Sequence, residues 1–243
     1  MRLVVTGGTG YLGSELVRRS GARGLSTRDL DIRDENAVAA ALHDADAVIH
    51  TAYRQEPAGE AWEVNVEGAR NVARATRDTR LVHISTDIVF GGLLGRPYLE
   101  DDPPSPVTEY GRSKAAAEEA VGSEHPEALI VRTSLIYGGA QPSKHEQAAH
   151  DATLTFYEDE LRNPVHVADL VDALLELVAT ELAGPLHVAG ADAVSRCEFA
   201  RLIAGEVRCG PAPPGRPLDC RLDSSRAQRI LRTRLRGVRE VLA

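Results

Sequence analysis

Short apolar runs alternate with amphipathic stretches through the first three-fifths of the chain. Runs rich in β-branched residues predict strands at residues 2–6, 47–51, 81–85 and 129–133, and a weaker strand at 22–27. The stretches between them predict helices at residues 11–20, 35–42, 61–76 and 113–121, with Asp34 as the N-cap of the second helix and Trp62, Val66 and Val72 among the apolar positions of the third. Strands joined by helical crossovers predict an α/β fold with a doubly wound parallel sheet.

The pattern changes after Gly138. Residues 139–152 are polar and alanine-rich without a clear period, residues 154–157 predict a short strand, and residues 165–179 predict a strongly amphipathic helix. Residues 210–217 include four prolines, which predict an extended loop. We therefore expect one large domain over residues 1–140, completed by 160–181, and a small, reduced C-terminal substrate lobe made of 141–159 and 182–243.

The bulk composition excludes some classes of partner. The chain has 243 residues and a formal net charge of −8, which argues against nucleic-acid and polybasic membrane-binding surfaces. No apolar run approaches the roughly 20 residues that span a bilayer. The first residues are not expected to form a signal peptide, so a cytoplasmic protein is expected. Cys197, Cys209 and Cys220 fit no metal-ligand spacing and predict reduced thiols without a metal.

A glycine loop joins the first predicted strand to the first predicted helix. Residues 6–13 read TGGTGYLG, in which Gly7 allows a tight turn, Gly10 lets the backbone approach a pyrophosphate, and Gly13 lets the helix lie close to the sheet. The helix N-terminus, at Tyr11 and Leu12, would present N–H groups to the phosphates. The loop predicts a dinucleotide-binding domain of the Rossmann type, and its spacing resembles that of the extended short-chain dehydrogenases/reductases.

The end of the second predicted strand bears on the choice of dinucleotide. It reads Leu25-Ser26-Thr27-Arg28, and Arg28 could pair with the 2′-phosphate of NADP through charge-assisted hydrogen bonds. Asp29 follows directly and could serve the ribose of NAD, so NADP is favoured and NAD stays open. Asp31 and Ile32 resemble the Asp–aliphatic pair that short-chain dehydrogenases place beside the adenine.

A catalytic element lies further along the chain. Tyr110 and Lys114 form a Y-x-x-x-K pair, which a helix would place one above the other. The lysine ammonium would lower the tyrosine pKa and allow the phenol to exchange a proton with a substrate. Ser85, Thr86 and Asp87 close a predicted buried strand, at the edge where an open α/β sheet places its ligand.

Longer segments make the resemblance close. Residues 81–91 read LVHISTDIVFG and residues 97–118 read PYLEDDPPSPVTEYGRSKAAAE, and both are similar to segments of the dTDP-4-dehydrorhamnose reductase family. The similarity continues at residues 29–34, 62–66, 131–134 and 163–170 and near Arg216, so it touches most of the chain.

The resemblance implies roles for individual residues. Thr86, Tyr110 and Lys114 would be catalytic: Tyr110 would protonate a ketone oxygen as hydride arrives, and Thr86 would polarise that oxygen, with Ser85 as a less favoured substitute. The implied cofactor contacts beyond the glycine loop are Thr51, Ala52, Tyr53, Ser85, Tyr110, Lys114, Thr133 and Ser134. Asp87 and Tyr110 are the implied substrate contacts, and Arg132 is a weaker candidate.

The chain departs from the family where substrate binding is expected. The stretch after Tyr137 is short and polar, so a smaller or differently shaped carbonyl compound stays open as the substrate. His145, Glu146 and His150 in this stretch lack zincin spacing, and His50 is expected to pack rather than react. A nucleotide-sugar epimerase or dehydratase, or a non-catalytic NADP-binding regulatory protein, are the rival functions. A homodimer is left open.

Overall fold

The computed structural model describes residues 1–55 and 58–242, apart from the side chain of Ala58. The chain divides into two compact units. The first unit contains residues 1–85, 109–131 and 174–185, and the second contains residues 86–108, 132–173 and 186–243. This division differs from the predicted boundaries: residues 86–108, 132–140 and 160–173 belong to the second unit, and residues 182–185 belong to the first. The functional domain assignment itself stays a prediction.

The first unit is built on a six-stranded sheet in the order β10-β5-β4-β3-β1-β2. Its strands are β1 (Leu3–Thr6), β2 (Arg23–Leu25), β3 (Ala47–His50), β4 (Arg80–Thr86), β5 (Leu129–Thr133) and β10 (Gly184–His187), of which the last residues of β4, β5 and β10 are counted with the second unit. β1 pairs in parallel with both β2 and β3, and β3 pairs in parallel with β4. The order therefore reverses between β1 and β3, the place where an open α/β sheet binds its ligand.

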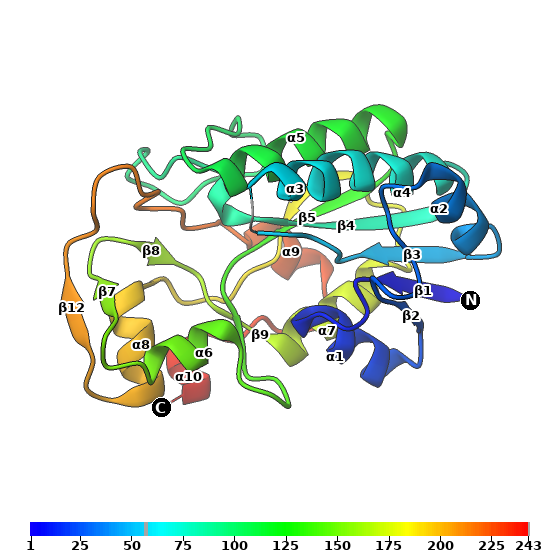
Figure 1. The fold of residues 1–243 in the computed structure, drawn as a ribbon. Coiled ribbons are helices and arrows are strands. Elements are labelled where there is room, and N and C mark those ends of the chain that lie inside the picture. The colour runs from blue at the N-terminus through cyan, green and yellow to red at the C-terminus, as the bar shows by residue number, and fades with distance from the viewer. Residues whose placement is uncertain (56–57, 243) are drawn as a thin grey trace. The chain divides into compact units, whose positions relative to one another are not determined.

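Helices of the first unit lie on both sides of this sheet. α1 (Tyr11–Ser20) lies on one side, and α2 (Glu35–Leu42), α4 (Ala69–Ala75) and α5 (Glu109–Glu124) lie on the other (Figure 1). Asp34 caps α2 by accepting a hydrogen bond from the Ala37 N–H at 3.0 Å, as predicted. The predicted fold class, a doubly wound α/β sheet, is confirmed.

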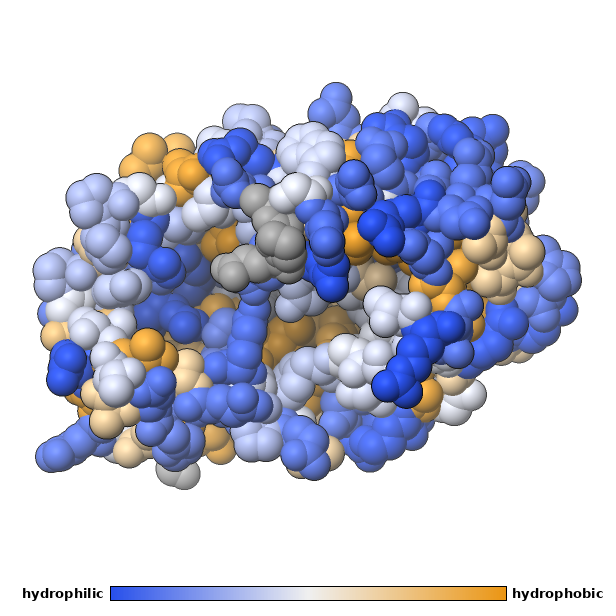
Figure 2. All heavy atoms as spheres, in the orientation of Figure 1, coloured by the Kyte–Doolittle hydropathy of each residue, from blue (hydrophilic) through white to orange (hydrophobic). Residues whose placement is uncertain are grey.

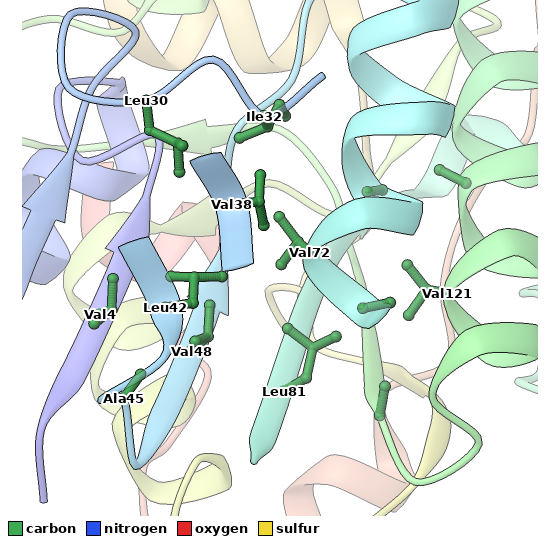
Figure 3. Close-up of a cluster of buried hydrophobic side chains, with 14 of the residues drawn as sticks. Val4, Leu30, Ile32, Val38, Leu42, Ala45, Val48, Val72, Leu81 and Val121 are labelled. Carbon is green, nitrogen blue, oxygen red and sulfur yellow. The ribbon is translucent and has the colours of Figure 1, made fainter. Parts of the chain in front are cut away.

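The core between the sheet and α2, α4 and α5 is aliphatic. Val38, Val48, Val72, Leu81 and Val121 converge there from two strands and three helices and are fully buried (Figure 3). The apolar positions predicted from the sequence thus form one continuous buried layer. This layer holds β3 and β4 in place, and with them the residues at their carboxyl ends.

The predicted helix at residues 61–76 is wrong in detail. It consists of α3 (Ala58–Trp62), a π-helical segment η1 (Glu63–Gly68) and α4. Trp62, one of the three apolar positions named for this helix, is 47% exposed, whereas Val66 and Val72 are buried. The wider π-helical turn changes the register that a uniform helix would give these side chains.

The second unit contains short elements. Three two-stranded ladders pair β6 (Ile136–Tyr137) with β9 (Val165–His166), β8 (Leu161–Arg162) with β11 (Val194–Ser195), and β7 (Thr155–Tyr157) with β12 (Arg208–Gly210). The helices are η2 (Asp87–Val89), α6 (Lys144–Ala149), α7 (Val167–Leu177), α8 (Arg196–Ala204), α9 (Ser225–Ile230) and α10 (Val238–Leu242), and the last residues of α7 belong to the first unit.

Two predictions in this unit need correction. The predicted helix at residues 165–179 begins as strand β9, and its helical part is α7. The stretch 139–152, which shows no period, contains the six-residue helix α6. A capping box between Ser143 and Glu146 starts α6, and a helix of under two turns is too short for its periodicity to be recognised. The predicted strand at 154–157 is confirmed by β7.

The prediction of three reduced thiols is wrong for two of them. Cys197 on α8 and Cys209 on β12 form a disulfide bond, and only the buried Cys220 is a free thiol. The sequence separation of 12 residues carries no sign of this pairing. It arises because β12 returns along β7, beside α8.

The outward side of α2 and α4 is hydrophilic, at the upper right of Figure 2. Arg74 of α4 lies there and pairs with Glu35 and Glu124, each at 2.8 Å. Within the described part of the chain, no helix combines the length and apolar character needed to cross a membrane.

Candidate active site

The glycine loop forms a tight cradle in the first unit. Gly7 adopts a positive φ of 75°, and a Cβ atom there would lie 2.7 Å from the Ala52 backbone nitrogen. A Cβ on Gly13 would lie 2.1 Å from the Gly7 carbonyl oxygen. Both spacings exclude a larger residue, because real Cβ contacts do not come this close. The predicted need for glycine at these two positions therefore has a steric cause.

The strand ends next to this loop hold it in place. The Thr51 hydroxyl, just after β3, donates to the Thr6 carbonyl at 2.7 Å, and the Gly8 N–H donates to the Leu25 carbonyl at 3.0 Å. Gly10 is the N-cap of α1 and provides no side-chain cap. A helix N-terminus without a side-chain cap, approached closely by glycine backbone, fits the pyrophosphate of a dinucleotide.

The turn after β2 separates two candidate cofactor ligands. The Asp29 carboxylate accepts hydrogen bonds from the Ser26 N–H at 2.8 Å and the Ser26 hydroxyl at 2.6 Å, and these bonds lower the pKa of Asp29. Arg28 is exposed on the same turn. The Asp29 carboxylate, which could bind a ribose, is thus hydrogen-bonded within the turn, whereas the Arg28 guanidinium beside it is exposed to solvent.

Asp31 and Ile32 are used in contacts within the first unit. The Asp31 carboxylate accepts from Arg33 at 2.6 and 2.9 Å, and Ile32 is buried in the aliphatic core. Gly68 of η1 lies so close to Ile32 that a Cβ there would be 2.6 Å from its side chain. The predicted adenine contacts of this pair stay a prediction.

Tyr110 lies in the first turn of α5, near the loop that follows β3. The rings of Tyr53 and Tyr110 have centroids 5.7 Å apart. A cavity of about 290 Å³ opens next to them, lined by Gln55, Gly59, Ala61, Trp62, Glu109, Tyr110, Arg112 and Ser113. The first unit therefore brings these two predicted aromatic side chains together, and Tyr110 lines the cavity.

Asn65, which was not predicted, connects this loop to α5. Its side-chain amide exchanges hydrogen bonds with the Arg54 backbone, at 2.8 Å to both N–H and carbonyl, and donates to the Ser113 hydroxyl at 2.9 Å. Asn65 is buried in the π-helical segment η1, and π-bulges are frequent at functional sites. The only sequence signal was its place in the family-like segment 62–66.

Lys114 lies one turn after Tyr110 and is buried. Its Nζ donates to the Ile84 carbonyl at 2.7 Å and lies 3.3 Å from His83 Nε2, both on β4. Burial lowers the pKa of Lys114 to about 8, and the Glu118 carboxylate partly opposes the shift. Ser85 donates to Glu118 at 2.5 Å, so its hydroxyl is engaged with α5.

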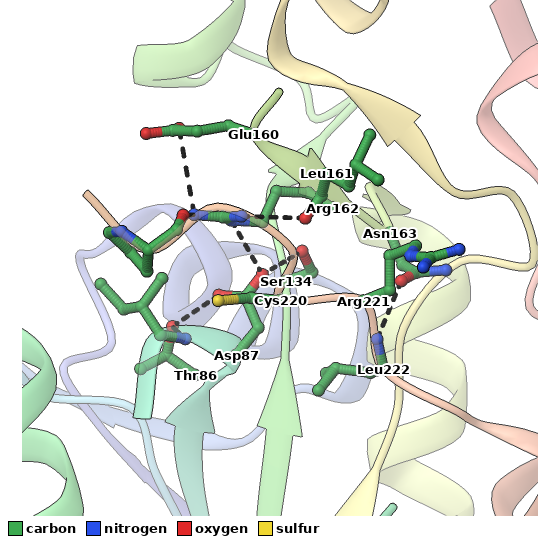
Figure 4. Close-up of polar contacts among 12 residues, drawn as sticks. Thr86, Asp87, Ser134, Glu160, Leu161, Arg162, Asn163, Cys220, Arg221 and Leu222 are labelled. Atoms are coloured by element: carbon green, nitrogen blue, oxygen red, sulfur yellow. Dashed lines mark hydrogen bonds and ion pairs between the residues drawn. The ribbon is translucent and has the colours of Figure 1, made fainter. Parts of the chain in front are cut away.

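The second unit gathers the remaining polar candidates around Asp87 (Figure 4). The Thr86 hydroxyl donates to the Asp87 carboxylate at 3.1 Å, and the Ser134 hydroxyl donates to it at 2.5 Å. The Arg162 guanidinium lies 3.5 Å from the same carboxylate. Burial raises the pKa of Asp87, and Arg162 and the two hydroxyls oppose that rise.

Arg162 anchors this group and was not predicted as a site residue. Its guanidinium donates to the carbonyls of Leu161, Pro217 and Leu218 at 2.7 to 2.8 Å. Thr133, next to Ser134, is buried, and its hydroxyl has no hydrogen-bond partner among the described residues. Arg132 lies over the Phe90 ring at 5.1 Å and donates to the Glu100 carbonyl at 3.1 Å, and its candidate role at the site stays a prediction.

Three basic residues of the second unit, here called the basic group, influence one another: Lys144 on α6, Arg196 on α8 and Arg216. Arg196 is half-buried, and its pKa falls to about 10 because burial disfavours the cation. The Arg216 charge lowers the pKa of Arg196 further, and the Arg196 charge in turn lowers the pKa of Lys144. The Arg216 guanidinium lies 4.9 Å above the Tyr157 ring. His145 lies 3.4 Å from Arg196, and burial lowers its pKa to about 3.

The structure brings together one set of possible metal ligands. Glu158, Cys197 and Cys209 offer atoms within 4.8 Å of one another in the described part of the chain, although the two cysteines are already joined. Glu146 is engaged in the capping box of α6. This set was not expected from the sequence, because its members come from three separate segments.

Comparison with known proteins identifies the family. A family model described as the RmlD substrate binding domain matches residues 1–243. The dTDP-4-dehydrorhamnose reductase of Mycolicibacterium smegmatis is 36% identical over 273 residues, covering 99% of this chain and 84% of that protein. The enzyme of the same name from Mycobacterium tuberculosis is 36% identical over 235 residues, covering 87% of this chain and 77% of that protein.

Solved structures agree with the sequence relatives. The dTDP-4-dehydrorhamnose reductase of Bacillus anthracis, in complex with NADP, has a TM-score of 0.89 at 28% identity and covers 99% of this chain and 96% of that chain. A hypothetical dTDP-4-dehydrorhamnose reductase from Sulfolobus tokodaii has a TM-score of 0.85 at 30% identity, covering 98% and 97%. The chain therefore belongs to the RmlD family, which its motifs resemble, and is an oxidoreductase of the short-chain dehydrogenase type.

Proposed function

We propose that this protein is an NADPH-dependent reductase of a keto group on a dTDP-activated deoxysugar. The observation that carries the proposal is the Tyr110–Lys114 pair, with Lys114 buried and held by β4. A buried cation is costly, and a chain that did not need its charge would be more stable with an apolar residue there. Relatives named dTDP-4-dehydrorhamnose reductase over nearly the whole chain support the same chemistry.

The cofactor-binding proposal is supported within the first unit. The cradle of Gly7, Gly10 and Gly13 fits a pyrophosphate. The Thr51 hydroxyl holds the loop by donating to the Thr6 carbonyl, and the Ala52 backbone lies close to Gly7. Arg28 would pair with a 2′-phosphate, because the neighbouring Asp29 is occupied by Ser26. The NADP complex of the Bacillus anthracis relative supports this choice of dinucleotide.

The chemical step uses residues of this chain at the ketone oxygen. When bound, NADPH supplies the hydride that reduces the ketone carbon. Tyr110 would donate its phenolic proton to the oxygen, and the Lys114 ammonium would stabilise the phenolate left behind. Thr86 would donate a second hydrogen bond, which requires its single hydroxyl proton to turn from Asp87 to the substrate.

The nucleotide part of the substrate would use the basic group of the second unit. Lys144, Arg196 and Arg216 provide three cations on a chain whose net charge is −8. Guanidinium groups suit phosphate oxygens because they can donate two parallel hydrogen bonds. A diphosphate-linked sugar therefore fits this unit better than an uncharged ketone.

The test is NADPH oxidation, followed by absorbance, with dTDP-4-dehydrorhamnose as the substrate. Stoichiometric oxidation is expected with the wild-type protein, and Y110F is expected to lose about 10²- to 10⁴-fold in kcat with NADPH affinity unchanged. Product formation without net NADPH oxidation would instead indicate an epimerase. Binding of NADPH without turnover of any keto-sugar nucleotide would favour the regulatory protein.

Two further expectations stay predictions. A homodimer would give twice the mass of the 26.1 kDa chain in light scattering. The cytoplasmic location would be tested by cell fractionation.

A further inference from the structure

Two buried histidines lie side by side in the sheet of the first unit. His50 on β3 and His83 on β4 are directly opposite each other in the parallel register, and each is 1% exposed. Their ring centroids are 5.1 Å apart. Neighbouring core positions on these strands, such as Val48 and Leu81, are aliphatic. The presence of two imidazoles in this core therefore calls for a physical explanation.

His83 is in contact with the lysine of the proposed catalytic pair. Lys114 Nζ lies 3.3 Å from His83 Nε2 and 2.7 Å from the Ile84 carbonyl oxygen. An ammonium carries three N–H donors and no acceptor, so His83 must offer a lone pair at Nε2 and carry its proton at Nδ1. Two of the three donors are thus directed at β4, which leaves one direction for a bound ligand.

Both imidazoles stay neutral. Burial and the Lys114 charge lower the pKa of His83 well below its usual value, and the same two causes lower the pKa of His50 to about 3. His50 Nδ1 lies 2.6 Å from the Thr6 hydroxyl oxygen. A protonated imidazole here would repel the ammonium, whereas a neutral one can accept from it.

The other nitrogen of each ring indicates that the two imidazoles do not stabilise the fold. His83 Nδ1 and His50 Nε2 are buried and have no hydrogen-bond partner among the described residues. Leaving buried polar atoms unpaired destabilises the fold, and an aliphatic residue would avoid that cost. For His83, the contact with Lys114 is the interaction that an aliphatic residue could not replace.

Other ionisable groups also face Lys114. Glu118, one turn later on α5, raises the lysine pKa, and its carboxylate also accepts from Ser85 on β4. Tyr110 lies one turn earlier on α5, with Tyr53 beside it. Among the described residues, Glu118 is the charged group that acts on the Lys114 pKa, and His83 is the neutral acceptor that fixes the direction of the ammonium.

We propose that His83 is a positioning residue for Lys114, and that its neutral imidazole, together with the Ile84 carbonyl, orients the ammonium toward the bound ligand. The inference rests on the proposed function, in which Lys114 acts next to Tyr110. It adds a requirement that the catalytic motif does not contain: an acceptor on the preceding strand β4, three residues before Thr86.

The sequence permits a direct test on the protein without turnover. The chain contains only two lysines, Lys114 and Lys144, so lysine labelled with ¹³C at Cε gives two NMR signals, and K144R assigns them. The Lys114 titration is compared in wild type, H83L, H83N and H83Q. H50L is the matched control, because it removes the opposite imidazole, which is not hydrogen-bonded to the lysine.

The expected result is a midpoint for Lys114 that falls by about one pH unit in H83L and in H83N, whose shorter amide cannot reach Nζ. One unit corresponds to a tenfold weaker preference for the ammonium. H83Q, which keeps a long acceptor, and H50L are expected within about 0.3 unit of wild type, by the same conversion a factor of two. H83N keeps the test decisive if H83L fails to fold.

Kinetics separates this inference from the proposed function. If wild type reduces the keto-sugar nucleotide, H83L should lower kcat about tenfold with NADPH affinity little changed, and H83Q should recover most of that loss. An unchanged Lys114 midpoint in H83L and H83N, or equal shifts in H83L and H50L, would overturn the positioning role. A wild-type protein that shows no turnover would instead contradict the proposed function, whatever the lysine titration shows.

Discussion

Alanine is expected to have opposite effects on stability at two helical glycines, one in the glycine loop and one outside it. Gly13 lies in the first turn of α1, and Gly122 lies in the last turns of α5. Neither has a positive φ, so alanine is compatible with the backbone at both positions. They differ in what a Cβ atom would meet: nothing within 4 Å at Gly122, and the Gly7 carbonyl oxygen at 2.1 Å at Gly13.

The magnitudes follow from these distances. Alanine gains about 1 kcal/mol over glycine in a helix interior, somewhat less near an end, so G122A should stabilise the protein by about 0.5 kcal/mol. At Gly13 the new methyl group must move away from the Gly7 carbonyl by about 1 Å or more to reach a normal contact of roughly 3.5 Å. Overpacking of this kind costs about 1–3 kcal/mol, which outweighs the gain in propensity.

The same displacement should weaken cofactor binding. The Gly7 carbonyl accepts from the Gly10 N–H at 2.9 Å, so moving it shifts the N-cap of α1 as well. Hydrogen bonds from that helix N-terminus to a pyrophosphate depend on its position. We expect G13A to raise the Kd for NADPH about tenfold or more, equivalent to about 1.4 kcal/mol.

Urea denaturation measures the stability of both variants, and fluorescence titration with NADPH measures their affinity. G122A should be slightly more stable than wild type and bind NADPH equally well. If G13A were stabilised as much as G122A and bound NADPH like wild type, the cradle would not be as tight as the Cβ distances indicate, and the steric reasoning would be refuted.

Three further predictions concern other parts of the molecule. R28L should lower the preference for NADPH over NADH by about 10- to 100-fold, the worth of a charge-assisted hydrogen bond, in paired Kd measurements. C197S should reduce the free energy of unfolding by about 2–3 kcal/mol by opening a loop closed across 12 residues, and dithiothreitol should lower the Tm of wild type but not of C197S. The hydrogen bond from Arg96 is the main cause that lowers the pKa of Asp102 to about 2. The contribution of ionised Asp102 to the free energy of unfolding is therefore complete above its unfolded-state pKa and is lost as the pH falls toward 2. Wild type and D102N should therefore converge in stability at low pH.

Each of these has a result that contradicts it. An unchanged NADPH to NADH ratio in R28L would remove the role assigned to that guanidinium. Equal sensitivity of wild type and C197S to dithiothreitol would show that the thiols do not pair. A constant stability difference between wild type and D102N from pH 5 to pH 2 would show that the contact with Arg96 does not depend on the Asp102 charge.

Features that depend on neighbours in sequence were predictable. Gly7 and Gly13 are needed because a strand, a turn and a helix follow one another within a dozen residues, so the spacing itself encodes the geometry. Asp34 caps α2 through Ala37, three residues away. Lys114 and Tyr110 share a helix face because they are four residues apart.

Features that depend on distant segments were not predictable. Asn65 joins Arg54 to Ser113, and nothing in the local pattern indicates that its amide is enclosed by a π-helical turn. Arg162 reaches Asp87 across 75 positions of sequence, and Cys197 meets Cys209 only because β12 pairs with β7. A periodic pattern tells which side of an element is buried, but not which polar partner meets it there.

Net charge is another sequence property that does not show which residues come together in the fold. A value of −8 predicted no polyanionic partner, yet the second unit places Arg196, Lys144 and Arg216 near one another. Burial lowers the pKa of Arg196 to about 10, which shows that its charge is held at a cost. Glu160 offsets part of this charge by pairing with Arg216. The net charge therefore bears on extended polyanions, which the surrounding negative charge disfavours, but it does not exclude a small anionic ligand, whose binding to this unit stays a proposal.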